Sequence, residues 1–500
     1  MKNQLFVFLI AFLFLMSCTL LNGTAPGASA TAVPQEVATN TPNSVSSANN
    51  PPSPTALSTS TPAAPMPTST PSAPSDAVVV NTFEQDVYPF KPSGHCSLGE
   101  AIQTVLLQQV VDACVLPSGS HTVYMPTGTY TLTQSDNAPI VLYGTHPFPD
   151  RQHLDPAGFP VVASTLIILG NGSTIERTGS NQFGVFQVFV AGNLTLKDLT
   201  ISGGDTTAAS SGDGGGAIAV LGGSLALDHV TLIHNVAKEG GALDISVSLG
   251  GVTITNSTIT ENTSQESGGG IYTAGNLTIK DSLIGSNTAK GDVFGGGGIY
   301  NSDAQLTLDN SQIVGNMATL GGGIYNDGGT INVTNQSVIS GNVATWKFNG
   351  LSPDGGGGIN SRADHDQLVI DHSLIIGNQA PASFGGGIIA GGQMTKITGS
   401  VLSGNTAMTG GAVDVAAGQA SVNQSCILDN QTTSPKAFNG IENDSMDPIT
   451  VDATNNWWGI SAPSISGNVK ASPQLSNAPD ICGSSIPTPY PAPTYTLPSQ

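Results

Sequence analysis

Residues 268–287 have the sequence GGGIYTAGNLTIKDSLIGSN, and this stretch determines the fold. Apolar residues stand at Ile271, then at Leu277 and Ile279, and then at Leu283, with polar residues between them. This alternation predicts three short strands separated by turns at Gly, Asn and Asp. One such set of strands cannot enclose a hydrophobic core by itself, so it must stack on copies of itself.

Copies of this unit follow one another from about residue 215. The Gly-Gly-small-apolar motif that opens the unit occurs eight times, and its third residue advances by 25, 28, 28, 25, 35, 29 and 25 residues. An asparagine that closes the unit advances in phase, by 27, 25, 29, 26, 36, 27 and 25 residues. Because both series lengthen at the same place, they mark one structural period. The asparagines are Asn235, Asn262, Asn287, Asn316, Asn342, Asn378, Asn405 and Asn430.

This period predicts an all-β fold, a parallel β-helix whose coils form three sheets along a solenoid. The glycines fit positions where the backbone turns tightly or takes a positive φ. The asparagine side chains are expected to stack and to hydrogen-bond from coil to coil. About ten coils at ~4.8 Å each would make a rod on the order of 50 Å long. The 500 residues therefore predict one elongated domain, which accounts for many of the 62 glycines.

The open end of a solenoid needs a cap. Residues 96–102, CSLGEAI, predict the start of a helix that runs to about Ala113. Ser97 is the expected N-cap, and Glu100 completes a capping box with it. Among three possible connectivities of the four cysteines after Cys18, the sequence favours the local pairs Cys96–Cys114 and Cys426–Cys482. Each disulfide would close one end of the folded part.

The N-terminus has the features of an export signal. An apolar run from Leu5 to Met16 ends in the sequence LMSC, which resembles the lipobox of bacterial lipoproteins. The resemblance implies a signal peptide over 1–17 and a lipid on Cys18, which would anchor the protein at the cell surface. An ordinary signal peptide with an incidental cysteine is the alternative.

Composition divides the rest of the chain. Residues 18–80 are rich in Pro, Ser and Thr and predict a disordered linker after the anchor. Residues 81–165 are assigned to the cap and first coils, and 166–482 to the β-helix. Residues 483–500 are again rich in Pro and predict a disordered tail.

Three motifs carry a resemblance to a known class of proteins. Residues 96–102 resemble the Cys-Ser-Leu-Arg-Glu-Ala motif that opens many exported bacterial right-handed parallel β-helix proteins, with Gly99 in place of Arg. The Gly-Gly-Ala-Ile repeats resemble those of chlamydial polymorphic outer-membrane proteins. Residues 455–459, NNWWG, are similar to a segment common near the end of such β-helices, where Trp457 and Trp458 would seal the last coils. The resemblance implies right-handedness and leaves function open, since this fold carries adhesins, lyases and hydrolases.

Charge limits the classes of partner. The chain has 34 acidic and 13 basic residues and a net charge of −21, which argues against nucleic acid as a partner. An anionic polysaccharide would also meet a like-charged rod unless Ca²⁺ were bound. No EF-hand or RTX spacing and no Cys/His cluster is present, so we expect neither a metal site nor a cofactor.

Uronate lyases and glycoside hydrolases of this fold use clustered carboxylates. Asp244 and Asp414 follow the apolar residue of the repeat motif, but Tyr272, Tyr300 and Tyr325 hold near-equivalent positions in other coils. The sequence therefore does not predict a stacked acidic cleft, and the balance is against an enzyme.

The best candidate surface for a ligand lies in the one oversized coil, because insertions in solenoids often bind. Trp346 in this insertion would suit the face of a sugar ring, with Arg362, Asp364, His365 and Asp366 in the following turn. A solvated loop without function is the alternative. The sequence thus predicts a monomeric, surface-anchored, non-catalytic rod for adhesion or for binding a glycan or another surface polymer. The alternatives are a carbohydrate-active lyase or hydrolase on a pectate-lyase-like β-helix, and a structural envelope protein.

Overall fold

A computed structural model describes most of the chain after residue 71. The described ranges are 72–136, 155–208, 214–248, 250–292, 295–347, 354–434, 438–446, 448–483 and 487–494. The predicted signal peptide, Cys18 and nearly all of the predicted linker lie outside these ranges.

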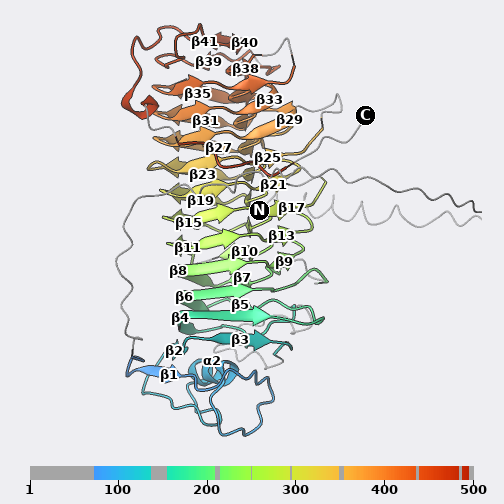
Figure 1. The fold of residues 1–500 in the computed structure, drawn as a ribbon, viewed down its shortest axis with the longest axis vertical. Coiled ribbons are helices and arrows are strands. Elements are labelled where there is room, and N and C mark those ends of the chain that lie inside the picture. Colours follow the sequence, from blue (N-terminus) through green and yellow to red (C-terminus); the bar gives the residue numbers. More distant parts are fainter. Residues whose placement is uncertain are drawn as a thin grey trace, which may run out of the picture. The chain divides into compact units, whose positions relative to one another are not determined.

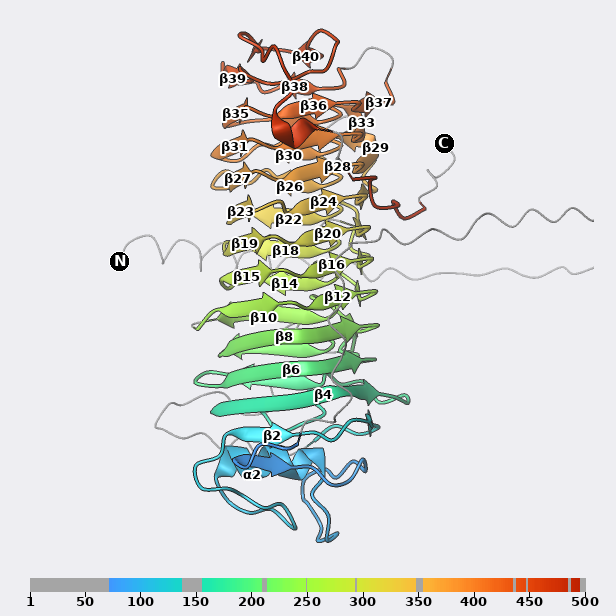
Figure 2. The same cartoon turned by 60° about the vertical axis from the view of Figure 1, so that its left-hand side comes forward.

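The described residues form a parallel β-helix in which successive coils stack along one axis, as the repeat predicts (Figures 1 and 2). Its strands belong to three sheets, which we name in the order in which each coil visits them. The first sheet follows the Gly-Gly motif and has eleven strands among the described residues: β5 (Phe186–Phe189), β7 (Ile218–Gly222), β10 (Leu243–Ser248), β14 (Ile271–Thr273), β18 (Ile299–Ser302), β22 (Ile324–Asp327), β26 (Ile359–Ser361), β30 (Ile388–Ala390), β34 (Val413–Val415), β38 (Ile441–Asn443) and β40 (Ile465–Ser466).

The second sheet comes next in each coil and bends around one corner of the solenoid. Three of its strands, β4 (Thr165–Arg177), β6 (Asn193–Ser202) and β8 (Ser224–Ile233), are long, whereas most later coils have two short strands separated by a residue with positive φ, such as Asn256 or Asp281. Its described strands are β1 (Ala77–Val79), β2 (Thr122–Tyr124), β3 (Thr129–Leu132), β4 (Thr165–Arg177), β6 (Asn193–Ser202), β8 (Ser224–Ile233), β11 (Val252–Thr255), β12 (Thr258–Thr260), β15 (Leu277–Lys280), β16 (Leu283–Gly285), β19 (Gln305–Asp309), β20 (Gln312–Val314), β23 (Thr330–Thr334), β24 (Val338–Ser340), β27 (Gln367–Asp371), β28 (Leu374–Ile376), β31 (Met394–Thr398), β32 (Val401–Ser403), β35 (Gln419–Asn423), β36 (Cys426–Leu428), β39 (Val451–Asp452) and β41 (Val469–Lys470).

The third sheet consists of short strands that directly follow the repeated asparagine. Its described strands are β9 (Val236–Ala237), β13 (Thr263–Ser264), β17 (Thr288–Ala289), β21 (Met317–Ala318), β25 (Val343–Ala344), β29 (Gln379–Phe384), β33 (Thr406–Thr409) and β37 (Gln431–Thr432). The predicted three sheets are therefore confirmed. Stacking in register places like residues on one another, so Ile271, Ile299 and Ile324 form one buried column of the core.

The asparagines form the expected ladder inside the solenoid. In each rung from Asn235 to Asn405, the backbone N–H and the Nδ2 group both donate to the Oδ1 of the next asparagine, at 2.9–3.1 Å. A second ladder, which the sequence analysis did not predict, runs through serines in the second sheet. The backbone N–H of Ser257, for example, donates to the Oγ of Ser282. These ladders satisfy backbone groups at corners where strand pairing is interrupted.

Helix α2 (Leu98–Leu107) covers the first coils at the N-terminal end (Figure 1). Ser97 accepts a hydrogen bond from the Glu100 N–H, and the Glu100 carboxylate accepts one from the Ser97 N–H, which confirms the capping box. The helix ends earlier than predicted, because Gln108 adopts a left-handed conformation with φ 53°. Strand β1 also begins before residue 81, inside the segment assigned to the linker.

Both predicted disulfides are present. The Cα atoms of Cys96 and Cys114 are 4.7 Å apart, and those of Cys426 and Cys482 are 5.8 Å apart. The second disulfide, with the short 3-10 helix η2 (Asp480–Cys482), returns the chain to the outside of the second sheet. There Ile481 and Cys482 pack against a buried cluster of Ile376, Val401 and Cys426.

A segment near the end of the sequence, residues 487–494, lies along the rod. The sequence assigned 483–500 to a disordered tail, whereas the structure places 487–494 against the outer surface, where the Tyr490 N–H donates to the Ser340 Oγ at 2.8 Å. Across the described ranges, no helix has the length and apolar character needed to cross a membrane.

Candidate binding face on the first sheet

The side chains on the face of the first sheet opposite the core column form one straight row along the solenoid, and most of them are buried. Strand register aligns the second residue of β10 through β38 in the order Asp244, Tyr272, Tyr300, Tyr325, Asn360, Ile389, Asp414 and Glu442. The row therefore mixes aromatic, amide, apolar and acidic groups. This agrees with the prediction that it is not a stacked acidic cleft.

Three tyrosines stack in the middle of this row. The ring centroids of Tyr272 and Tyr300 are 5.3 Å apart with an interplanar angle of 7°, and those of Tyr300 and Tyr325 are 5.3 Å apart at 12°. The central ring is 4% exposed, while the outer two rings are half-buried. Nearly parallel aromatic pairs of this kind contribute roughly 0.5–1.5 kcal/mol each beyond their buried area.

The hydroxyl groups of the stack meet acidic residues. Tyr300 Oη donates a 2.6 Å hydrogen bond to Asp327 Oδ2 at the end of β22. Burial, and then the negative charges of Asp327, Asp354 and Asp366, raise the pKa of Tyr325 to about 12, against a smaller opposing effect of Arg362. The Tyr325 phenol is therefore neutral at physiological pH and is able to donate a hydrogen bond.

Arg362, one of the predicted ligand residues, lies beside this stack. Its guanidinium forms an ion pair with Asp354, and its side chain lies over Gly391 of the next coil. A Cβ atom on Gly391 would stand 2.6 Å from the Arg362 Cγ, so only glycine allows this approach. We name Tyr272, Tyr300, Tyr325, Asp327 and Arg362 the tyrosine face.

Asp366 has a different position from the one its sequence context suggested. It is 0% exposed and accepts hydrogen bonds from the Gly328 N–H, the Ala363 N–H and the Ser361 hydroxyl. Burial raises the pKa of Asp366 to about 7, although these hydrogen bonds act in the opposite direction. The side chain thus fastens its turn to the preceding coil.

The remaining predicted ligand residues are divided between two places. Asp364 and His365 are exposed on the turn that Asp366 fastens. Trp346 lies just after β25 of the third sheet, where its N–H donates to the Thr319 carbonyl at 2.9 Å. The described geometry therefore groups Arg362 with the tyrosines and assigns Trp346 to a different sheet.

A second acidic group lies farther along the same sheet. Asp414 is 0% exposed, and burial, followed by the charge of Asp444, raises its pKa well above the usual range. The Thr409 hydroxyl donates to Asp414 Oδ2 at 3.1 Å, and the Asp444 carboxyl group is a further hydrogen-bond partner of Asp414. Burial also raises the pKa of Glu442 and of Asp444. Neighbouring carboxyl groups with raised pKa values tend to share protons.

The tyrosines also have a signal in the sequence. The motif Gly-Gly-Gly-Ile-Tyr occurs in three consecutive coils, and equal position in the repeat means equal position in the stack. Asp327 was not identified either, because its role depends on the fold of the turn after β22.

No family model matches the sequence, and no curated protein matches it. Among the described residues, no group of three or more His, Cys, Asp or Glu side chains is arranged to hold a metal ion.

Proposed function

We propose that this protein is a surface-anchored rod that binds an extended polysaccharide along the tyrosine face without cleaving it. The observation that carries the proposal is the straight, in-register stack of Tyr272, Tyr300 and Tyr325, bordered by Asp327 and Arg362. The stack repeats once per coil, at about 4.8 Å. A polymer that lies along the rod would therefore meet similar groups at regular intervals.

The chemistry of this face suits a neutral glycan. The half-buried rings of Tyr272 and Tyr325 offer apolar surface to the C–H faces of sugars, while phenols, carboxylates and a guanidinium offer hydrogen bonds to hydroxyl groups. The charge of −21 opposes the approach of a polyanion. A neutral or weakly charged polysaccharide is therefore the preferred ligand.

Binding is favoured over cleavage because of where the carboxyl groups lie. Hydrolysis of a glycosidic bond needs two carboxyl groups that reach the substrate. Asp366 and Asp414 have raised pKa values of the kind a catalytic acid needs, but both side chains are fully buried. Their burial supports a structural role for these two carboxyl groups and not a catalytic one.

A binding experiment tests this proposal. Purified full-length protein in detergent is screened against neutral and acidic polysaccharides, and any bound glycan is titrated against Tyr272→Ala and Tyr325→Ala. Each substitution should weaken binding at least about tenfold, the equivalent of 1.4 kcal/mol. Tyr88→Ala, which removes an exposed tyrosine near the N-terminal cap, is the matched control. Equal affinity in all variants would exclude the tyrosine face, and released sugar products would favour an enzyme.

The surface location is a separate part of the proposal and rests on the lipobox-like sequence at Cys18. Mass spectrometry of the membrane-extracted protein should find an N-terminal Cys18 that carries acyl chains. Cys18→Ser should release the protein from the membrane fraction, and an unchanged distribution would exclude lipid anchorage.

A further inference from the structure

The asparagine ladder stops at Asn430. This residue completes the preceding rung, since its Oδ1 accepts hydrogen bonds from the backbone N–H and the Nδ2 of Asn405 at 3.0 and 2.9 Å. Its own Nδ2 donates to the Leu402 carbonyl at 2.9 Å, as in the other rungs. The difference lies on its other side, where the next coil supplies no asparagine.

Three hydrogen-bonding groups of Asn430 are left without a partner among the described residues. In the preceding rung, the N–H of Asn405 and one Nδ2 hydrogen reach the next Oδ1, and its carbonyl accepts from the Gln431 N–H at 2.8 Å. The corresponding N–H, Nδ2 hydrogen and carbonyl of Asn430 have no such contacts in the described part of the chain. Two donors and one acceptor are therefore left on the side of the next coil. A hydroxyl group could pair with all three, because it accepts two hydrogen bonds and donates one.

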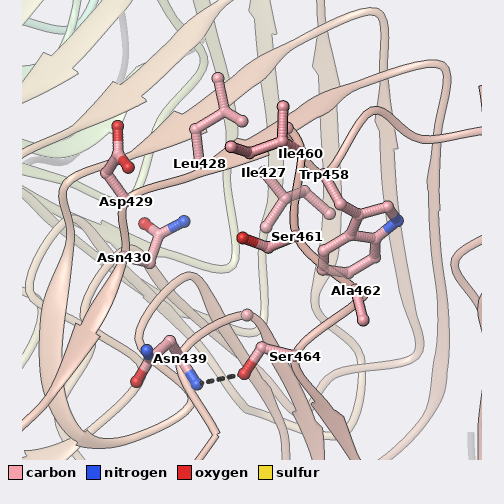
Figure 3. Close-up of a pocket in the computed structure, with 12 residues that line it drawn as sticks. Ile427, Leu428, Asp429, Asn430, Asn439, Trp458, Ile460, Ser461, Ala462 and Ser464 are labelled. Atoms are coloured by element: carbon pink, nitrogen blue, oxygen red, sulfur yellow. Dashed lines mark hydrogen bonds between the residues drawn. The ribbon is translucent and has the colours of Figure 1, made fainter.

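Asn430 lines a cavity. A parallel β-bridge between Cys426 and Trp457 aligns two adjacent coils. Asn430 and Ser461 each lie four residues beyond this bridge in their coils. Serine is shorter than asparagine, and a hollow of about 350 Å³ lies between the two coils. Figure 3 shows the Ser461 hydroxyl directed toward the Asn430 amide across this hollow.

The walls of the cavity combine one aromatic side with one polar side. The ring of Trp458 and the side chains of Ile427 and Leu428 form the apolar side (Figure 3). The polar side is closed by a 3.0 Å hydrogen bond from the Asn439 N–H to the Ser464 Oγ. The charged residue in the lining is Asp429, which disfavours an anion. The volume lies at the small end of the range for ligand pockets.

We propose that this cavity, which we name the ladder-end pocket, binds a single neutral sugar residue. One sugar hydroxyl would take the place of the missing Oδ1, accepting from the Asn430 N–H groups and donating to its carbonyl. The apolar face of the sugar would lie on the Trp458 ring. This site is separate from the tyrosine face, and it supplies recognition of one residue at the C-terminal end of the rod.

Titration calorimetry of the full-length protein in detergent tests this proposal. The probes are neutral monosaccharides, galacturonate, and oligosaccharides that carry the best monosaccharide either at the end or internally. We expect a neutral monosaccharide to bind and galacturonate to bind at least about tenfold more weakly. Binding of the terminal but not the internal residue would identify a glycan end as the source, and binding of the free sugar alone would identify a small-molecule site.

The decisive variant is Ser461→Asn, which would offer the missing Oδ1 to Asn430 and so occupy the hydrogen-bonding end of the pocket. It should reduce sugar affinity at least about tenfold while leaving the protein folded and no less stable. Ser466→Asn makes the same exchange on β40 outside the pocket and should bind like the wild type. Tyr325→Ala should also leave monosaccharide binding unchanged, which separates this site from the tyrosine face. Absence of binding by every neutral sugar, or equal binding by Ser461→Asn and Ser466→Asn, would overturn the proposal.

Discussion

Tyr300 and Asp327 connect two adjacent coils through one hydrogen bond, since the Tyr300 hydroxyl donates to Asp327 Oδ2 at 2.6 Å. The tyrosine is the central ring of a three-membered stack, and the carboxylate lies at the end of the next strand of the same sheet. The hydrogen bond therefore fixes both the position of the ring along the rod and the direction of the phenol. The same pair therefore links two coils and lies in the proposed binding face.

Tyr300→Phe should keep the stack and lose this hydrogen bond. A bond from a hydroxyl to a carboxylate contributes about 1–2 kcal/mol, so the free energy of unfolding should fall by that amount. Tyr300→Ala also removes two ring contacts and should cost about 3 kcal/mol or more. Urea denaturation followed by circular dichroism measures both. Equal stability of Tyr300→Phe and the wild type would show that the hydrogen bond does not stabilise the coil pair.

Asn316→Ala should be among the most destabilising substitutions in the ladder. It removes the acceptor of two hydrogen bonds from Asn287, at 2.9 and 3.1 Å, and leaves a buried backbone N–H without a partner. Each buried unsatisfied donor costs about 1–3 kcal/mol, so a total near 3 kcal/mol is expected.

Ser311→Ala is the control for that substitution, because Ser311 belongs to the serine ladder and accepts one longer bond, from the Ser282 N–H at 3.3 Å. Its cost should be about 1 kcal/mol. Thermal and urea unfolding of the two variants should differ accordingly. If both variants lost the same stability, the asparagine ladder would have no special weight in the fold.

The stability of the rod should fall as the pH rises from about 4 to about 7. Burial raises the folded-state pKa of Asp366 to about 7, and it also raises the pKa of Asp414, Glu442 and Asp444. In this window the folded protein holds protons that the unfolded chain has released, so each unit of pH weakens folding. For Asp366 alone the loss is at most about 4 kcal/mol.

Asp366→Asn should flatten this pH dependence, although it also disturbs the hydrogen bonds from Ala363 and Ser361. The slope of the unfolding free energy against pH should therefore be compared between the variant and the wild type. The unfolding free energy at a single pH also contains the effect of the lost hydrogen bonds. Asp205 and Asp452 have lowered pKa values, so their effects fall below pH 4 and leave this window unchanged. A rod whose stability does not change between pH 5 and pH 7.5 would contradict the assigned burial of these carboxyl groups.

The repeat allowed the stacking of the rod to be predicted, because equal spacing of Asn287 and Asn316 requires equal position in successive coils. The capping box at Ser97 is likewise a local pattern that sequence can carry. The ladder-end pocket was not predictable, since it depends on how the irregular last coil places Ser461 opposite Asn430. The burial of Asp366 was not predictable for a related reason: its three hydrogen-bond donors include Gly328, which is remote in the sequence.

The position of the C-terminal tail is a similar case, and its signal is visible once the structure is known. In four consecutive coils the residue before the ladder asparagine is glycine with a positive φ: Gly315, Gly341, Gly377 and Gly404. The tail lies on the first three of these, where added Cβ atoms would stand 2.1–2.5 Å from Pro489 or Tyr490. The high proline content predicted disorder. Composition does not show that the rod has a strip of glycine residues without side chains, on which this segment can pack.

Gly341→Ala should displace this tail, and Gly404→Ala provides its matched control. The two glycines have nearly the same left-handed backbone, with φ of 62° and 64°, so alanine should strain each by about 1–2 kcal/mol. At Gly341 the new Cβ would stand 2.1 Å from the Tyr490 carbonyl oxygen, whereas at Gly404 the nearest atom is 3.9 Å away. Both variants should therefore lose similar stability, but only Gly341→Ala should speed exchange of the Tyr490 amide, whose N–H donates to Ser340. Rapid exchange of the Tyr490 N–H in the wild type, or equal exchange in both variants, would show that the tail does not rest on the glycine strip.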